Sequence, residues 1–185
     1  MIGEIYDDHV LKDIQDAQGL GLDGFALNFD QFASWSNNTV ERLFKHADAE
    51  NFKLFFSFDH DKTSPGLPKP VAYASFLKAY MARPSYLRLR NKPLVTTFGG
   101  ESIPDRDWSD LKREAGDMNL VLGSYKSSPS SFFSGRSSVD GVFNWNSWPD
   151  SGSKKKDDVS CTADRAFQSA ANVSRHCKRC IRFRH

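Results

Sequence analysis

Polar and aromatic side chains that could bind a sugar follow several apolar runs of the sequence. Asn28 and Asp59 each come at the end of such a run, and Glu101 follows a pair of glycines after a third. Amides and carboxylates hydrogen-bond to hydroxyl groups, and aromatic faces stack against the apolar face of a pyranose. These residue types predict a carbohydrate site, and the candidate substrate-binding residues are Asn28, Asp59, Glu101, Trp145, Asn146 and Trp148.

Each candidate also has a purely structural interpretation. Asp59 ends a strongly apolar run, where an unpaired carboxylate is costly to bury, so it is either a site residue or a strand-end ion pair or cap. Asn28 could equally serve strand-end hydrogen bonding, and the two tryptophans could belong to the core. Asp59 and Glu101 are the carboxylates that could take part in acid–base chemistry, but the sequence assigns neither as catalytic.

Two further residues follow Asp59 directly. We interpret His60 as a loop histidine and Asp61 as a solvated loop acid. No second histidine ends a predicted strand, so we expect no metal at this position and no cofactor for the protein.

The elements that must position these residues alternate along the chain. Apolar spacing predicts helices over residues 8–20, 38–51, 71–82 and 105–115, with a weaker one over 158–172. Apolar runs predict strands over residues 23–29, 52–58, 93–98, 119–122 and 138–145. Such alternation is typical of parallel β/α units.

Two architectures of β/α units compete. A doubly wound sheet usually has a glycine-rich phosphate turn after a strand, and no strand end here carries G-x-G-x-x-G or G-x-x-x-x-G-K-[ST]. We therefore predict an α/β fold, a partial (β/α)8 TIM-type barrel with about five β/α units. In such a barrel the chemistry lies at the carboxyl ends of the strands, where the candidate residues stand.

Composition excludes some classes of protein. The chain has 185 residues, 39% of them hydrophobic and 26% charged, which is typical of a globular protein. No run approaches the ~20 apolar residues of a membrane-spanning helix, so we expect no membrane partner. The net charge of +2 arises from five basic residues after position 173, which leaves 20 basic against 23 acidic side chains before it. We therefore expect no nucleic-acid partner.

The end of the chain differs from the rest. The three cysteines, Cys161, Cys177 and Cys180, lie in the last 25 residues, together with the basic cluster. One C-x-x-C pair supplies half the ligands of a structural zinc site, so we predict none. We divide the chain into a barrel segment over residues 1–158 and a basic, Cys/Arg-rich tail over residues 159–185 that is disordered or out of frame.

Four motifs in this order resemble the fungal glycoside hydrolase family 71. They are GLDGFALN (residues 21–28), FKLFFSFD (52–59), KPLVTTFGGE (92–101) and VDGVFNWNSWP (139–149). The resemblance implies a (β/α)8 barrel that hydrolyses α-1,3-glucan of fungal cell walls, with inversion at the anomeric carbon. It also implies secretion, although the first residues carry no export signal.

The resemblance implies a member truncated at both ends, and the sequence departs from that family in three respects. The family usually begins with an extra strand, of which residues 1–3 are at most a stub. Members commonly have Trp-Asp where this chain has Trp145-Asn146. The acid and base proposed for the family lie in a downstream segment resembling Trp-Asn-Asp-x-Gly-Glu-Ser, which these 185 residues do not contain. We therefore expect an inactive α-1,3-glucanase fragment, and the alternative is a non-catalytic α-glucan-binding protein. Its expected partner is a polysaccharide in either case.

Overall fold

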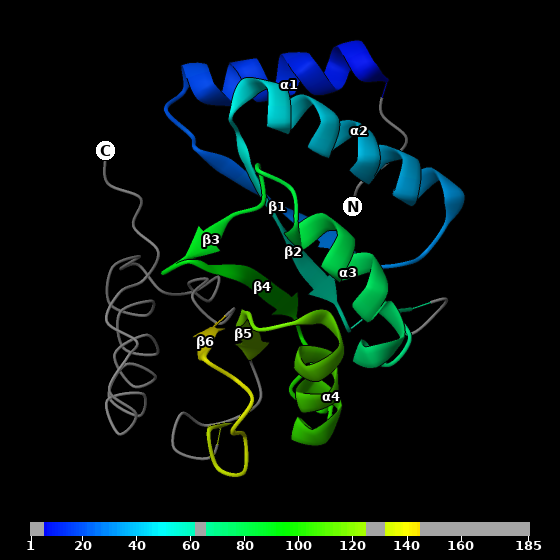
Figure 1. The fold of residues 1–185 in the computed structure, drawn as a ribbon, viewed down its shortest axis with the longest axis vertical. Coiled ribbons are helices and arrows are strands. Elements are labelled where there is room, and N and C mark those ends of the chain that lie inside the picture. Colours follow the sequence, from blue (N-terminus) through cyan, green and yellow to red (C-terminus); the bar gives the residue numbers. More distant parts are fainter. Residues whose placement is uncertain (1–5, 62–65, 125–131, 145–185) are drawn as a thin grey trace, which may run out of the picture.

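The computed structural model describes residues 6–61, 66–124 and 132–144 (Figure 1). Their elements, in chain order, are α1 (Asp7–Gly19), β1 (Gly24–Phe29), α2 (Ser34–Glu50), β2 (Lys53–Asp59), the 3₁₀ turn η1 (Pro70–Tyr73), α3 (Ala74–Met81), β3 (Arg88–Leu89), β4 (Lys92–Phe98), α4 (Asp105–Ala115), β5 (Asn119–Ser124) and β6 (Gly141–Asn144).

Five of the strands form one parallel sheet. Its order is β1-β2-β4-β5-β6, so each strand lies beside the next one along the chain, while β3 pairs with β4 as a short antiparallel hairpin. A doubly wound sheet reverses its strand order, whereas the wall of a (β/α) barrel follows the chain. The prediction of an α/β fold, a partial barrel with about five β/α units, is confirmed.

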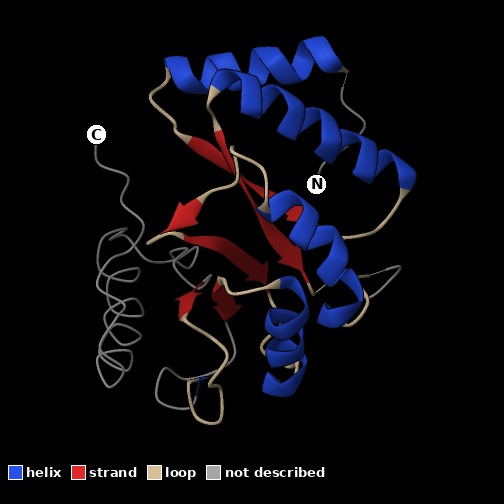
Figure 2. Ribbon diagram, in the orientation of Figure 1, coloured by secondary structure: helices blue, strands red, loops and turns tan. Residues whose placement is uncertain are grey.

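One face of this sheet is covered by helices. Figure 2 shows α1 and α2 along one end of the sheet, with α3 and α4 continuing the same layer. Leu54, Phe56 and Phe58 of β2 are fully buried, whereas Phe55 and Asp59, which alternate with them, are half-buried. Since side chains alternate between faces along a strand, Phe55 and Asp59 point to the other face, which is the inner face of the barrel wall.

Most predicted elements are present, with shifted boundaries. Helix α2 begins four residues before the predicted range, because Ser36 receives a hydrogen bond from the amide of Ala33 and donates to the carbonyl oxygen of Gln31. The helix predicted over residues 71–82 is divided into η1 and α3. Strand β6 begins at Gly141, three residues later than predicted. The helix predicted over residues 158–172 lies outside the described residues.

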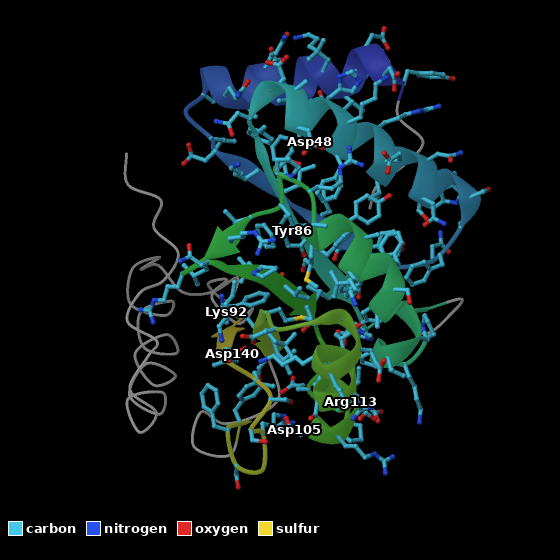
Figure 3. The ribbon with its side chains drawn as sticks, in the orientation of Figure 1. Asp48, Tyr86, Lys92, Asp105, Arg113 and Asp140 are labelled. Carbon is cyan, nitrogen blue, oxygen red and sulfur yellow. The ribbon has the colours of Figure 1, made fainter. Side chains whose placement is uncertain are left out.

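An ionic network joins the end of α2 to the segment that follows α3. Arg83 donates from Nε to Asp48 at 2.8 Å, and the amide and hydroxyl of Ser85 donate to the other oxygen of the same carboxylate. Figure 3 labels Asp48 on α2. Burial alone would raise the pKa of Asp48, but the hydrogen bonds from Ser85 and Arg83 outweigh it and hold the pKa below its usual value.

Among the described residues, no helix is both long enough and apolar enough to cross a membrane.

We expect Asp48→Asn to lower the free energy of unfolding by about 1–3 kcal/mol at pH 7, because buried donors lose a charged acceptor. A lowered folded-state pKa stabilises the fold above the unfolded value near 3.8, and this contribution is lost as the pH falls through the folded value. The difference between wild type and variant should therefore shrink below about pH 4. Urea titrations at several pH values measure it.

Asp117→Asn is the matched control for this substitution. Asp117 also has a lowered pKa, caused first by its hydrogen bond from Lys92, but its side chain is 67% exposed against 24% for Asp48. We expect its unfolding free energy to stay close to that of the wild type at every pH. A difference for Asp48→Asn that is independent of pH would contradict the ionic interpretation.

Candidate functional site

The carboxyl ends of the parallel strands bring candidate residues together at one edge of the sheet. Asn28 lies near the end of β1, Asp59 is the last residue of β2, and Ser124 is the last residue of β5. Glu101 follows β4 at the same edge. Polar residues at the ends of strands some 30 residues apart in sequence thus lie at the same edge of the sheet, as the barrel prediction requires.

Asn28 and Asp59 form a hydrogen-bonded pair. The register places Asn28 opposite Ser57, so Asn28 and Asp59 point to the same face of neighbouring strands. Nδ2 of Asn28 donates to Oδ2 of Asp59 at 3.4 Å, and the amide of Asp61 donates to Oδ1 at 3.0 Å. Both side chains are half-buried. A carboxylate offers about four acceptor positions, so two protein donors orient Asp59 and leave capacity for ligand hydroxyls.

Glu101 forms a second pair with the neighbouring strand. Oγ of Ser124 donates to Oε2 of Glu101 at 2.8 Å, and Ser124 itself is fully buried. Nη2 of Arg136 donates to the backbone carbonyl of Glu101 at 2.5 Å. The guanidinium of Arg136 also lies over the ring of Phe132, at 4.9 Å from its centroid. Glu101 is therefore held at its side chain by β5 and at its backbone by the segment before β6.

The two glycines before Glu101 permit this geometry. Gly99 and Gly100 have φ angles of +70° and +89°, a region that favours glycine. A Cβ on Gly99 would lie 2.2 Å from Oδ1 of Asp61, and one on Gly100 would lie 3.1 Å from Cζ2 of Trp108. The two glycines therefore allow the close approach of the protein's own side chains, those of Asp61 and Trp108.

His60 is half-buried and packs toward the helix layer. Its backbone amide donates to the carbonyl of Phe98, its Nε2 lies 3.0 Å from the hydroxyl of Tyr73, and its ring makes an edge contact with Trp108 at 5.3 Å. Burial lowers the pKa of His60 to about 4, an effect that the negative charge of Asp59 partly offsets. His60 is therefore neutral near pH 7 and links β2 to the helix layer.

The other predicted residues divide into two groups. Asp61 is exposed, as expected. Trp145, Asn146 and Trp148 lie outside the described residues, so their part in the site stays a prediction. Strand β6 ends at Asn144, which belongs to the same edge.

Sequence reasoning missed Arg136 and the Tyr73–His60 contact. Arg136 stands in a serine- and glycine-rich loop that has no periodic signal. Tyr73 lies within the helix predicted over residues 71–82. Its hydroxyl has a partner because a buried phenol usually finds one, but the pattern of the sequence does not say which.

The described residues contain no cluster of three or more histidine, cysteine, aspartate or glutamate side chains that could hold a metal ion. The three cysteines lie outside this part of the chain.

The strands form a parallel sheet in chain order, and two carboxylates, Asp59 and Glu101, lie at its carboxyl edge. This is the edge at which (β/α)-barrel enzymes carry their catalytic residues. Comparison with known proteins agrees. The model of glycosyl hydrolase family 71 matches residues 1–177, so the chain belongs to that family. The match runs past residue 158, where we drew the boundary before the Cys/Arg-rich tail. The division into residues 1–158 and 159–185 is not tested by it.

Three curated relatives carry names of the same activity. The glucan endo-1,3-α-glucosidase agn1 of Schizosaccharomyces pombe is 31% identical over 177 residues, covering 87% of this chain and 39% of that protein. A mutanase of Penicillium rubens is 26% identical over 141 residues, covering 76% and 31%. The ascus wall endo-1,3-α-glucanase of S. pombe is 26% identical over 148 residues, covering 75% and 34%. The chain spans about a third of the length of these relatives.

Two solved structures share the fold. They are structures of the family 99 endo-α-mannosidase of Bacteroides thetaiotaomicron, one of them in complex with bis-tris propane, with TM-scores of 0.65 and 0.63 and sequence identities of 14% and 13%. Each match covers 91% of this chain and about half of the mannosidase, 53% and 50%. At such identity the likeness supports the barrel fold and nothing finer.

The contact between β4 and β5 that supports Glu101 should be sensitive to added volume. A Cβ on Gly123 would lie 2.6 Å from the carbonyl oxygen of Thr97 and 3.3 Å from the amide nitrogen of Gly99. We expect Gly123→Ala to lower the free energy of unfolding by about 1–3 kcal/mol, because the backbone there cannot give way easily. Chemical denaturation of the purified protein measures this.

Gly141→Ala serves as its control on the adjacent strand. The three atoms nearest to its Cβ would all belong to the side chain of Val121, the closest at 3.2 Å. We expect a loss of less than about 1 kcal/mol there. Equal effects of the two substitutions would show that the β4–β5 contact is not tight.

Proposed function

We propose that this protein acts on α-1,3-glucan as a glycoside hydrolase, and that Asn28, Asp59 and Glu101 hold a glucosyl unit at the carboxyl edge of the sheet. The observation that carries this is the Asn28–Asp59 pair, together with Glu101 and Ser124, in a member of glycosyl hydrolase family 71. The names of the relatives point to the substrate. Oriented carboxylates and amides are the groups that recognise sugar hydroxyls.

In this proposal the two carboxylates bind and orient the sugar. Inverting hydrolysis requires one carboxylic acid to protonate the glycosidic oxygen and one carboxylate to activate water, with the two about 6.5–9.5 Å apart. Both oxygens of Asp59 already accept protein N–H groups, which suits an acceptor of sugar hydroxyls better than a proton donor. Glu101 likewise accepts the Ser124 hydroxyl. We place the acid and base in the segment that the family resemblance puts downstream.

The 185 residues therefore supply substrate binding without the acid–base pair. We infer that this chain alone binds α-1,3-glucan and does not hydrolyse it. Trp145, Asn146 and Trp148, after β6, would extend the binding edge. We also propose a secreted protein, because its polysaccharide partner is a component of cell walls, and no nucleic-acid partner, because residues 1–173 carry more acidic than basic side chains.

The first experiment measures retention on insoluble α-1,3-glucan and release of soluble sugar by the 185-residue chain, beside the complete S. pombe glucan endo-1,3-α-glucosidase. We expect retention and no release from the chain, and both from the relative. Substituting Asp59→Asn or Glu101→Gln should weaken retention about five- to tenfold, because each removes a charged acceptor for a sugar hydroxyl. Insoluble β-1,3-glucan is the control polysaccharide, and Asp117→Asn is the control variant.

The outcomes separate the candidate functions. Sugar release by the chain alone would overturn the assignment of the acid and base to a downstream segment. Absence of retention by well-folded chain would overturn the proposed substrate. Retention by a longer form of the protein that contains the downstream segment, without sugar release, would favour the non-catalytic α-glucan-binding alternative.

A further inference from the structure

Phe32 is an exposed aromatic residue that the rest of the structure holds in place. Its side chain is 39% exposed. Its ring makes edge contacts with Phe29 and Phe76, at centroid distances of 4.9 and 5.1 Å, and lies nearly parallel to the ring of Tyr73 at 6.1 Å. A large apolar side chain left partly in water, yet fixed from several sides, offers a rigid surface to a ligand.

The backbone that carries Phe32 is fixed as well. Phe32 stands in the short connection between β1 and α2, where Ser36 binds the residues on both sides of it. The hydroxyl of Ser36 donates to the carbonyl oxygens of Gln31 and Ala33 at 2.9 and 2.8 Å and accepts the amide of Ala33 at 3.1 Å. The ring is therefore ordered before any ligand arrives, and binding would cost little conformational entropy.

Phe32 belongs to the same edge of the sheet as the candidate site. It follows Asn28 by four residues, at the carboxyl end of β1. Tyr73 stacks on Phe32, and its hydroxyl lies 3.0 Å from Nε2 of His60, the residue after Asp59. These contacts connect the exposed ring to the turn that follows Asp59, on the helix side of the sheet.

We propose that Phe32 is an aromatic platform for a second glucosyl unit of the polysaccharide, next to the unit held by Asn28 and Asp59. The inference rests on the proposed function and deepens it. A pyranose has an apolar face of C–H groups that packs against an aromatic ring, and a polysaccharide must extend beyond the unit bound by the carboxylates. Since β1 is one edge strand of the described sheet, this platform lies on the side of the site away from β6.

The test is the dependence of affinity on ligand length. Purified protein is titrated calorimetrically with α-1,3-linked glucose oligomers of two to six units. We expect affinity to rise with length in the wild type. Phe32→Ala should lower the affinity for the longest oligomer about tenfold and leave the disaccharide nearly unchanged, because an outer platform touches only longer ligands. Phe32→Trp should restore the long-chain affinity.

Two further variants separate loss of the platform from loss of the fold. Phe32→Leu retains an apolar side chain over Phe29 and Phe76 but lacks an aromatic face, so it should keep the melting temperature of the wild type and still lose long-chain affinity. Leu89→Ala is the exposed control. Leu89 is 48% exposed and lies in the hairpin that β3 forms with the beginning of β4, at the amino end of the sheet. We expect it to bind every oligomer as the wild type does.

The failure of this inference can be told apart from the failure of the proposed function. If the wild type binds no α-1,3-linked oligomer, the proposed substrate is wrong and the platform has no ligand. If the wild type binds with affinity that rises with length, and folded Phe32→Leu matches it at every length, the substrate stands and the platform is refuted. An equal loss for all lengths would assign Phe32 a role in shaping the Asn28–Asp59 pair, which also contradicts the proposal.

Discussion

The contacts of Phe56 with its aromatic neighbours are the interaction on which the described structure depends most. Phe56 is fully buried in the middle of β2. The aromatic rings with centroids within 6.2 Å of its own are those of Phe29, Phe44, Phe58, Phe76, Tyr80 and Tyr86. They come from β1, α2, β2, α3 and the segment before β3, so one side chain joins the sheet to two helices. Removing so large a ring from such a layer costs about 3–5 kcal/mol in well-packed cores.

This layer determines how β2 presents its last residues. Because side chains alternate along a strand, fixing Phe56 and Phe58 on the helix side turns Asp59 to the opposite face. Tyr73 then stacks on Phe58 with 4.3 Å between centroids and bonds to His60, so the turn after β2 is fixed on both sides of Asp59. The position of the carboxylate follows from apolar packing one residue earlier, and the polar contacts of Asp59 only complete it.

Strand and helix identity could be predicted from the sequence because it depends on apolar spacing within one segment. The near-continuous run of residues 52–58 matches β2 to within one residue, and the stripe over 105–115 matches α4. The chain order of the sheet followed from the absence of phosphate motifs and from general rules of connection. Prediction was weaker where a distant or polar contact determines the boundary or existence of an element. Examples are the start of α2, which depends on Ser36, and the two-residue strand β3.

In the candidate site, too, local features could be predicted from the sequence and distant contacts could not. Asn28, Asp59 and Glu101 could be predicted because strand ends can be located from the sequence, and the shared edge follows from parallel pairing. Their partners could not, because each contact joins residues about 20 to 35 positions apart: Ser124 with Glu101, and Arg136 with the backbone of Glu101. Nothing in the local pattern around Arg136 distinguishes it from a solvated loop residue. Such contacts appear only once the register of neighbouring strands is known.

Each candidate carboxylate is oriented by the strand next to its own. Asp59 of β2 takes its donor from β1, and Glu101 after β4 takes its donor from β5. The amide of Asp61 and the guanidinium of Arg136 add a contact to Asp59 and to the backbone of Glu101. The candidate residues at the carboxyl edge are therefore positioned mainly by the pairing of successive β/α units. Such pairing can position Asp59 and Glu101 within the described strands, which is what the proposal of a downstream acid and base requires.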